Sequence, residues 1–324
     1  MTVNDVFDHF HDDLRQIEIY MESCLRSEVI LIPEIIRHIV GSGGKRFRPL
    51  LLLAASSMCG YHGERRYPMA VIIEFIHTAS LLHDDVIDEA DTRRGKSSAN
   101  RLWGNAASVL VGDFLYSKSF CLMTEHGNTA IIKLLSETTN TMSEGEVLQL
   151  IKRGDTNITE QNYLDIIDKK TAVLMAASCA MGGHLGDAAP ANITALSQFG
   201  QRLGTAFQMT DDILDYVAEE KSFGKAIGKD LEERKLTLPM IRTMSQCTPA
   251  ERDYLQTVLA QNNWDDATLA KMTTLINSHD GIDYTMAKAR SLTAEAQNLL
   301  TLFPDSAAKD ALLTIAAYVT NRRI

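Results

Sequence analysis

Residues 81–96 read Leu-Leu-His-Asp-Asp-Val-Ile-Asp-Glu-Ala-Asp-Thr-Arg-Arg-Gly-Lys, and an apolar run at residues 71–82 leads into them at helical spacing. On a helix, Asp84 and Asp88 stand one turn apart on one face, with Asp85 beside them. Their like charges repel, and they fall at the C-terminal end of the expected helix, where the helix dipole is already negative. Carboxylates gathered against this repulsion indicate a bound cation. Oxygen ligands that leave some waters in place suit Mg²⁺.

The same Asp-Asp-x-x-Asp spacing recurs at Asp211, Asp212 and Asp215. We call the two sets the first and the second triad. The second also ends an amphipathic run, for which Asn192 is the expected N-cap. A single acidic run is more often a solvated helix face than a metal site. Two helices that each end in such a triad could instead face each other across a cavity and hold divalent ions that bind a diphosphate. The recurrence favours this metal site.

Composition limits the classes of protein that fit the chain. The 42 acidic residues outnumber the 32 basic ones, and the net charge of −10 argues against a general nucleic-acid surface. The five cysteines include no Cys-x-x-Cys pair, so we expect reduced thiols in a cytoplasmic protein. The sequence shows neither a signal peptide nor a run of about 18 uncharged apolar residues, so no membrane span is expected.

The seven prolines and the scarcity of alternating apolar and polar runs predict an all-α protein. Because no linker-like change in composition and no short repeat is found, we expect one domain over residues 1–324. Helices are expected at residues 3–26, 34–40, 50–58, 68–88, 106–123, 131–150, 159–181, 193–216 and from Pro239 onward.

Residues 41–49, Gly-Ser-Gly-Gly-Lys-Arg-Phe-Arg-Pro, form a glycine-rich basic linker. The linker lacks the spacing of a nucleotide P-loop, because the first glycine position holds isoleucine. A flexible backbone with Lys45 and Arg48 could still hold a phosphate, and a plain helix–helix connection is the alternative. Together with His77 and Arg94, these residues are candidates for a diphosphate site away from the metals. His77 alone is equally consistent with a buried structural histidine.

A metal-bound diphosphate predicts one kind of chemistry. Mg²⁺ and cationic side chains neutralise the charge that grows on a departing diphosphate. The carbon left behind then becomes a carbocation, which forms most readily when that carbon is allylic. Apolar walls below both triads would keep water away from this cation.

These residues resemble the trans-polyprenyl diphosphate synthase family, and most closely the proteobacterial octaprenyl diphosphate synthases of ubiquinone side-chain synthesis. The resemblance runs along essentially the whole chain, and its motifs are residues 43–49, 73–100, 104–116, 144–150, 170–171, 207–216 and 235–239. It implies a large all-α bundle around a deep central cavity, assembled as a homodimer. It also implies a Mg²⁺-dependent prenyltransferase that condenses isopentenyl diphosphate repeatedly onto an allylic diphosphate such as farnesyl diphosphate.

The resemblance also implies a role for particular residues. Those that would bind three Mg²⁺ ions and the allylic diphosphate are Asp84, Asp85, Asp88, Asp211, Asp212 and Asp215. Those that would contact this diphosphate or the reacting end are Arg93, Lys170, Thr171, Gln208, Lys225 and Lys235, with Lys170 counted as catalytic. Those that would hold isopentenyl diphosphate are Lys45, Arg48, His77 and Arg94. The chain departs from the family at Arg234, commonly glycine, and at Lys229, often acidic, which leaves Lys225 and Lys235 least secure.

Small residues precede the first triad on its helix. Ser80 and Ala79 lie four and five positions before Asp84, one turn down the expected cavity wall. The resemblance implies a long product, because bulky aromatic residues at these positions stop chain growth early in the family. Ile76 would line the next turn, and Met123 is a candidate for the cavity floor. Close helix packing is the other explanation for two small residues here.

Other functions fit parts of the pattern. A metal-dependent phosphohydrolase would use water as the acceptor, and it gives no role to Lys45 and Arg48. A terpene cyclase shares the ionisation step, but an aromatic content of 6% is low for a site that stabilises cations with aromatic walls. An inactive partner subunit should have one degraded triad, whereas both are intact. A synthase of shorter products stays open. We expect a cytoplasmic enzyme that contacts a membrane only peripherally, when product is released.

Replacing Ala79 by Tyr should shorten the product, because the phenol ring would fill the cavity wall one turn below Asp84. Product sizing after incubation with Mg²⁺, farnesyl diphosphate and labelled isopentenyl diphosphate measures the change. Circular dichroism shows whether the variant is folded. A folded variant with unchanged product length contradicts the chain-length assignment.

Overall fold

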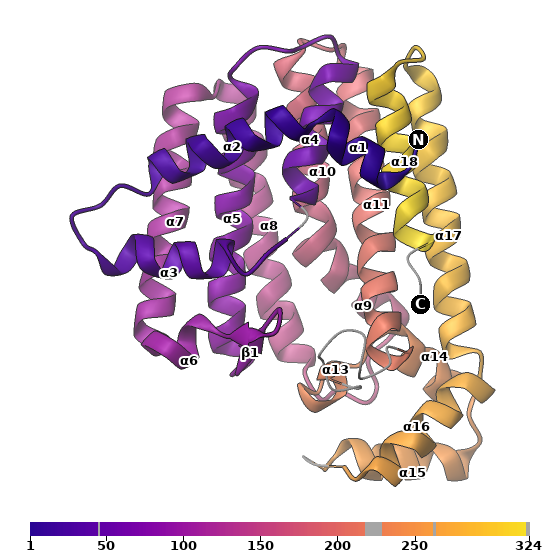
Figure 1. The fold of residues 1–324 in the computed structure, drawn as a ribbon. Helices are drawn as coiled ribbons and strands as arrows, with labels where there is room; N and C mark the ends of the chain where they lie inside the picture. The colour runs from indigo at the N-terminus through magenta and orange to yellow at the C-terminus, as the bar shows by residue number, and fades with distance from the viewer. Residues whose placement is uncertain (45, 218–228, 262–263, 322–324) are drawn as a thin grey trace. The chain divides into compact units, whose positions relative to one another are not determined.

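The computed structural model describes residues 1–44, 46–217, 229–261 and 264–321 (Figure 1). Its helices are α1 (Val3–His9), α2 (His11–Cys24), α3 (Leu31–Val40), α4 (Phe47–Met58), α5 (Arg66–Ile87), α6 (Ala99–Trp103), α7 (Asn105–His126), α8 (Thr129–Lys152), α9 (Glu160–Ile167), η1 (Asp168–Ala172), α10 (Val173–Leu185), α11 (Pro190–Val217), α13 (Lys229–Glu232), α14 (Leu238–Gln246), α15 (Pro249–Leu259), α16 (Asp266–Ser278), α17 (Gly281–Leu299), η2 (Leu300–Leu302) and α18 (Ala307–Asn321). The strands β1 (Thr92–Arg93) and β2 (Lys96–Ser97) pair antiparallel. The predicted all-α class is confirmed.

The chain forms two compact units, which we describe separately. Unit 1 comprises residues 1–139, 174–200 and 299–315, and unit 2 comprises residues 140–173, 201–298 and 316–324. The first triad belongs to unit 1 and the second triad to unit 2. That the triads face each other across one central cavity therefore stays a prediction, as does the single domain.

Helix α5 forms the centre of unit 1. It packs along α7 and also contacts α2 and α4. Every side chain from Pro68 to Ile76 is buried, which is typical of a helix in a protein interior. Burial of apolar area stabilises the fold by about 25 cal/mol per Å². The first triad thus stands at the end of a helix that the core holds firmly.

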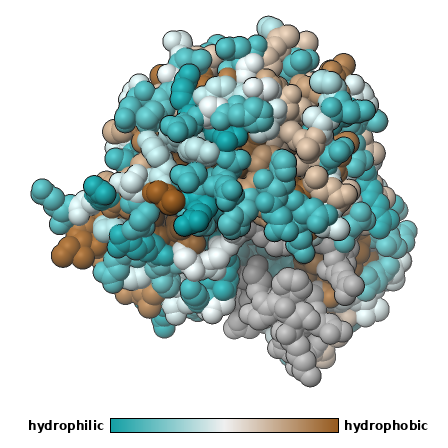
Figure 2. All heavy atoms as spheres, turned by 45° about the horizontal axis from the view of Figure 1, so that its top comes forward, coloured by the Kyte–Doolittle hydropathy of each residue, from teal (hydrophilic) through white to brown (hydrophobic). Residues whose placement is uncertain are grey.

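Helix α7 is apolar over most of its length, as the sequence predicts. Among the described residues, α7 is the helix that is long and apolar enough to cross a membrane. Of its apolar 18-residue segment, 39% is buried inside the structure. A core helix of a soluble protein has the same length and composition, so one such helix is weak evidence for a span. The face of the molecule in Figure 2 is mostly hydrophilic with scattered hydrophobic residues, as folded protein surfaces usually are.

In unit 2, a π-helical turn interrupts the predicted helix 159–181. The predicted start is confirmed: Thr159 Oγ1 accepts from the Asn162 backbone N–H at 3.1 Å, in a capping box. The π turn η1 contacts α8 and α11 at glycines. A Cβ on Gly145 would lie 2.8 Å from Lys169 Cβ, and one on Gly204 would lie 2.5 Å from Ala172 Cα. Such π turns are frequent at functional sites, and here the turn carries Lys170 and Thr171.

Several predicted helix boundaries are wrong. The helix predicted at residues 3–26 is two helices separated at Phe10. Helix α11 begins at Pro190, so Asn192 is not its N-cap. Proline suits the first helical position, where its missing N–H has no partner to lose. Helix α4 begins at Phe47, before the predicted position 50, with Arg46 as a left-handed N-cap at φ 48°.

Candidate active site

The first triad lies at the C-terminal end of α5, with Asp88 as the C-cap residue. The Asp88 backbone N–H donates to the Asp84 carbonyl at 2.8 Å, so the two carboxylates share one helix face, as predicted. Asp84 and Asp88 are partly exposed, whereas Asp85 is fully buried. Arg93 donates to Asp85 Oδ1 through Nε at 2.7 Å and through Nη2 at 2.6 Å. The outer carboxylates therefore face outward, while the middle one is held by a guanidinium.

A short hairpin, which the sequence analysis missed, presents Arg93 and Arg94. Arg93 ends β1, and the turn residues Arg94 and Gly95 have φ of 51° and 75°. Positive φ at both positions is the geometry of a type I′ turn, which matches the twist of paired strands. In the sequence, Gly95 was the residue that could have indicated this turn. Desolvation and the like charge of Arg93 lower the pKa of Arg94.

Most of the predicted isopentenyl diphosphate site comes together in unit 1. The pKa of His77 lies well below its usual value because of burial and the positive charges of Arg48, Arg94, Arg93 and Arg46, named in decreasing order of effect. The imidazole is therefore neutral at pH 7. A Cβ on Gly44 would lie 2.8 Å from Arg94 Nη1, so glycine permits the contact between linker and hairpin. Lys45 lies outside the described residues.

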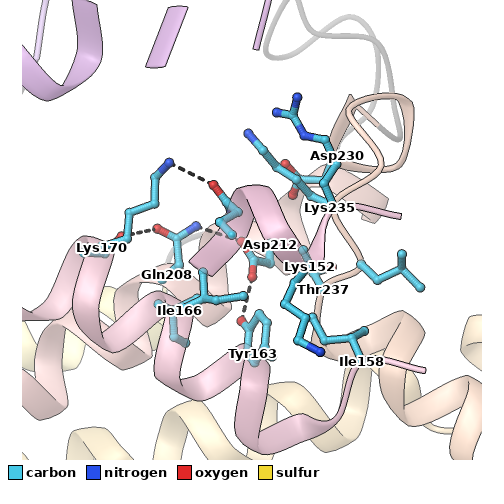
Figure 3. Close-up of a pocket in the computed structure, with 15 residues that line it drawn as sticks. Lys152, Ile158, Tyr163, Ile166, Lys170, Gln208, Asp212, Asp230, Lys235 and Thr237 are labelled. Atoms are coloured by element: carbon cyan, nitrogen blue, oxygen red, sulfur yellow. Dashed lines mark hydrogen bonds between the residues drawn. The ribbon is translucent and has the colours of Figure 1, made fainter. Parts of the chain in front are cut away.

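The second triad repeats the arrangement of the first. Asp211 and Asp215 are partly exposed on α11, and Asp212 is 4% exposed. The Tyr163 hydroxyl donates to Asp212 Oδ2 at 2.6 Å, and Gln208 Nε2 donates to Oδ1 at 2.8 Å (Figure 3). Burial raises the pKa of Asp212 to about 7, although both hydrogen bonds lower it. In each triad, a protein donor thus holds the middle carboxylate.

Three residues that the sequence predicted near the reacting end lie close together in unit 2. Thr171 Oγ1 donates to Gln208 Oε1 at 2.9 Å, which fixes the amide that holds Asp212. Lys170 Nζ donates to Glu146 Oε2 at 2.6 Å and to Gln149 Oε1 at 2.9 Å. No role was predicted from the sequence for Glu146 and Gln149, although they lie one turn apart on one helix face.

Helix α13 contacts the second triad through Asp230. The Asp230 backbone N–H donates to Asp215 Oδ2 at 3.0 Å. Lys235 Nζ donates to Glu233 Oε2 at 2.7 Å. Arg234 has φ 57°, a conformation that glycine adopts without strain. Lys225 and the side chain of Lys229 lie outside the described residues.

A pocket of about 120 Å³ in unit 2 contains much of this site (Figure 3). Its charged lining residues are Lys152, Arg153, Lys170, Lys235, Asp212 and Asp230. Its apolar wall includes Ile158, Ile166 and Ile167. Carboxylates, cations and an apolar wall in one pocket suit a ligand that has an ionic end and a hydrocarbon end.

The donor set fits Mg²⁺ better than a metal held by protein alone. Within the described ranges, no three His, Cys, Asp or Glu side chains are close enough to hold an ion by themselves. Each triad offers two outer carboxylates on one helix face. Mg²⁺ typically takes one or two carboxylates and completes its shell with waters and substrate phosphates.

The predicted chain-length residues lie in the core of unit 1. Ala79, Ile76 and Met123 are buried. Ser80 is partly buried, and its hydroxyl donates to the His77 carbonyl at 2.8 Å. Burial agrees both with a cavity wall and with close helix packing, so the tunnel past these residues stays a prediction.

The two sites also contain four residues for which no role was predicted from the sequence: Tyr163, Asp230, Arg46 and Glu74. Tyr163 follows the Thr159 cap by four positions on an apolar helix face, where a tyrosine usually belongs to the core. Glu74 lies within a run of buried apolar residues. No spacing signal marks either residue, because its partner lies far away in the sequence.

Replacing Tyr163 by Phe should weaken Mg²⁺-dependent activity at low pH. The Tyr163 hydrogen bond lowers the pKa of Asp212, so its loss raises that pKa and leaves the carboxyl protonated up to a higher pH. The acid limb of the pH–rate profile should move to higher pH, and half-maximal activity should need more Mg²⁺. Tyr284→Phe is the matched control, since it removes a phenol–carboxylate bond to Glu160 elsewhere in unit 2. Identical profiles for both variants would contradict the role of Tyr163.

Comparison with known proteins identifies the family. A sequence model described as polyprenyl synthetase matches residues 30–276. The chain is 41% identical to the octaprenyl diphosphate synthase of Escherichia coli (strain K12), over 92% of each chain. It is 34% identical to an all-trans-nonaprenyl-diphosphate synthase (geranyl-diphosphate specific) of Rhodobacter capsulatus, over 98% of this chain and 97% of that one.

Solved structures agree with the sequence comparisons. A decaprenyl diphosphate synthase from Rhodobacter capsulatus superposes with a TM-score of 0.94 at 38% identity, over 99% of both chains. A polyprenyl synthase from Caulobacter crescentus CB15, complexed with calcium and isoprenyl diphosphate, gives a TM-score of 0.95 at 35% identity, over 100% of this chain and 98% of that one. The chain therefore belongs to the polyprenyl synthetase family and is a prenyltransferase, a trans-prenyl diphosphate synthase of the long-chain type.

Proposed function

We propose that the chain is a Mg²⁺-dependent octaprenyl diphosphate synthase that supplies the side chain of a quinone. It would condense isopentenyl diphosphate repeatedly onto an allylic starter such as farnesyl diphosphate, as one catalytic domain in the cytoplasm. The observation that carries the proposal is the matched geometry of the triads, each with two outer carboxylates on one helix face. The octaprenyl product is supported by the 41% identity to the Escherichia coli enzyme.

The outer carboxylates are the groups that would hold the metal. These are Asp84 and Asp88 in unit 1 and Asp211 and Asp215 in unit 2. Bound Mg²⁺ supplies the positive charge that stabilises a departing diphosphate. Asp85 and Asp212, which the family resemblance also implies as metal ligands, accept hydrogen bonds from Arg93 and Tyr163, and these bonds fix their positions.

Cations of the chain would bind the remaining oxygens of the allylic diphosphate. Lys170 contacts the carboxylate of Glu146, and Lys235 contacts that of Glu233. Binding of the diphosphate would exchange these contacts for stronger ones to its oxygens. Arg93 bonds to Asp85 through Nε and Nη2, so its Nη1 is the nitrogen to offer the diphosphate. Lys225 is assigned here by the family resemblance alone.

Isopentenyl diphosphate would bind the basic cluster of unit 1, formed by Arg48, His77 and Arg94 together with Lys45. The neutral imidazole of His77 can accept or donate a hydrogen bond, and the arginines provide the charge. The double bond of isopentenyl diphosphate would attack the allylic cation and form the new carbon–carbon bond. The released diphosphate would then take the proton lost from the adjacent carbon. Gln208 and Thr171 would line the reacting end.

A phosphohydrolase is the second candidate, and the basic cluster argues against it. Hydrolysis needs only water and one diphosphate site. It would leave the cluster of Arg48, His77 and Arg94 in unit 1 without a role. Incubation with Mg²⁺, farnesyl diphosphate and labelled isopentenyl diphosphate separates the two functions. A long labelled polyprenyl product is expected. Phosphate release without isopentenyl diphosphate would favour hydrolysis.

Substitution of either triad should abolish condensation. Asp84→Asn and Asp211→Asn each remove one carboxylate charge at nearly constant volume, and each should lower kcat by about 10²- to 10³-fold or more. The matched control is Asp12→Asn on the exposed side of α2, which should retain wild-type rates. Circular dichroism checks folding. Wild-type turnover in either triad variant would refute the assignment.

We also propose a homodimer that forms through α7. The helix leaves apolar side chains exposed in unit 1: Val109 is 38% exposed, Leu110 67% and Phe120 46%. Val109 and Phe120 are about three helical turns apart and so share one face, and Leu110 lies beside that face. An exposed apolar stripe of this kind is typical of a protein–protein interface.

Leu110→Asp should convert a dimer into a monomer, because it places a charge at the most exposed of these apolar residues. Sedimentation velocity at about 10 μM measures the state. Leu302→Asp is the control, since Leu302 is also exposed but lies outside α7. A monomeric wild type, or a dimer that tolerates Leu110→Asp as well as the control, would contradict this interface.

A further inference from the structure

Glu74 is a buried carboxylate of unit 1 to which the proposed chemistry assigns no part. It lies on α5, one turn before His77, and its side chain is 7% exposed. A carboxylate is rarely buried without a charged partner. The partner is Arg46, whose Nη1 donates to Glu74 Oε1 at 2.8 Å.

Arg46 connects three helices at the edge of the basic cluster. It caps α4 in the left-handed conformation, with φ 48°. Its Nη2 donates to the carbonyl of Val40 at the end of α3, at 3.3 Å. A non-glycine residue keeps this conformation only where its surroundings hold it. The ion pair to Glu74 is such a restraint, and it ties the start of α4 to the middle of α5.

The charge of Glu74 also acts on the arginines of the cluster. Arg46, Arg48, Arg93 and Arg94 all place positive charge around His77. On Arg94, the charges of Arg93 and Arg46 oppose the protonated state, whereas the charge of Glu74 favours it. Guanidinium groups gathered this closely repel one another. A buried carboxylate among them offsets that repulsion.

We propose that Glu74 is a positioning residue of the second diphosphate site: it holds Arg46 and keeps the neighbouring arginines converged around His77 before isopentenyl diphosphate binds. Glu74 would act through these side chains without touching the substrate. This inference rests on the proposed function, because it takes the basic cluster to be the isopentenyl diphosphate site.

The effect of neutralising Glu74 on diphosphate binding has opposite signs for a positioning residue and for a residue that acts only through its charge. Glu74 carries the same sign of charge as the diphosphate, so if it acted only through the electric field, its neutralisation would strengthen binding of the anion. If Glu74 positions the arginines, neutralisation weakens binding. The sign of the change therefore separates the two roles.

The test is Glu74→Gln, which keeps the size of the side chain and removes its charge. We expect KM for isopentenyl diphosphate to rise at least about tenfold, because one partner of a buried ion pair is lost. KM for farnesyl diphosphate should change less than about twofold, since Asp85 holds Arg93 and the other proposed contacts of that diphosphate, Lys170 and Lys235, lie in unit 2. Arg46→Gln should have the same effect, and the double variant should add little to it. Glu64→Gln is the matched control, because Glu64 is exposed just before α5.

The outcomes distinguish this inference from the proposed function. An unchanged or lower KM for isopentenyl diphosphate in folded Glu74→Gln overturns the positioning role. If the wild type does not condense the substrates, the proposed function fails. In that case, calorimetric titration with isopentenyl diphosphate alone tests the positioning role of Glu74. Binding by Glu74→Gln that equals or exceeds that of the wild type overturns the inference. If Glu74→Gln does not fold, Glu74→Asp retracts the carboxylate but keeps its charge, and a wild-type KM in that variant overturns it.

Discussion

The repulsion among three carboxylates at a helix C-terminus is the constraint on which the two sites depend. Both units reduce this repulsion in the same way. The middle aspartate is buried, and a hydrogen-bond donor from another element holds its carboxylate. Arg93 of the hairpin holds Asp85, and Tyr163 of α9 holds Asp212. The outer carboxylates remain one turn apart on the outward face. Binding of a divalent ion and a diphosphate would offset this repulsion.

Irregular backbone places the cations around these carboxylates. Arg46, Arg94 and Arg234 all have positive φ, and Lys170 and Thr171 lie on a π turn. Residues in such conformations persist only where the surrounding structure fixes them, and they gather at functional sites. The helices provide rigid supports, and the chain departs from regular geometry where it must aim a charged side chain.

The helical class and both triads could be predicted because they depend on local spacing. Asp84 and Asp88 share a face on any α-helix, and the Thr159 cap is a local signal. The pairings of Glu74 with Arg46 and of Tyr163 with Asp212 could not be predicted, since each joins residues that are distant in sequence. The π turn was missed because it packs closely against Gly145 and Gly204, and no periodicity reveals such contacts.

We propose, from the family resemblance, that both triads bind metal together around one diphosphate. Titration of Mn²⁺ into the protein with inorganic diphosphate, followed by electron paramagnetic resonance of free Mn²⁺, tests it most directly. If the triads act together, substituting one outer aspartate in either unit removes the diphosphate-dependent binding, and substituting one in both units has little further effect. Two losses that simply add, or metal binding that persists at one triad when the other is lost, would contradict a shared metal site.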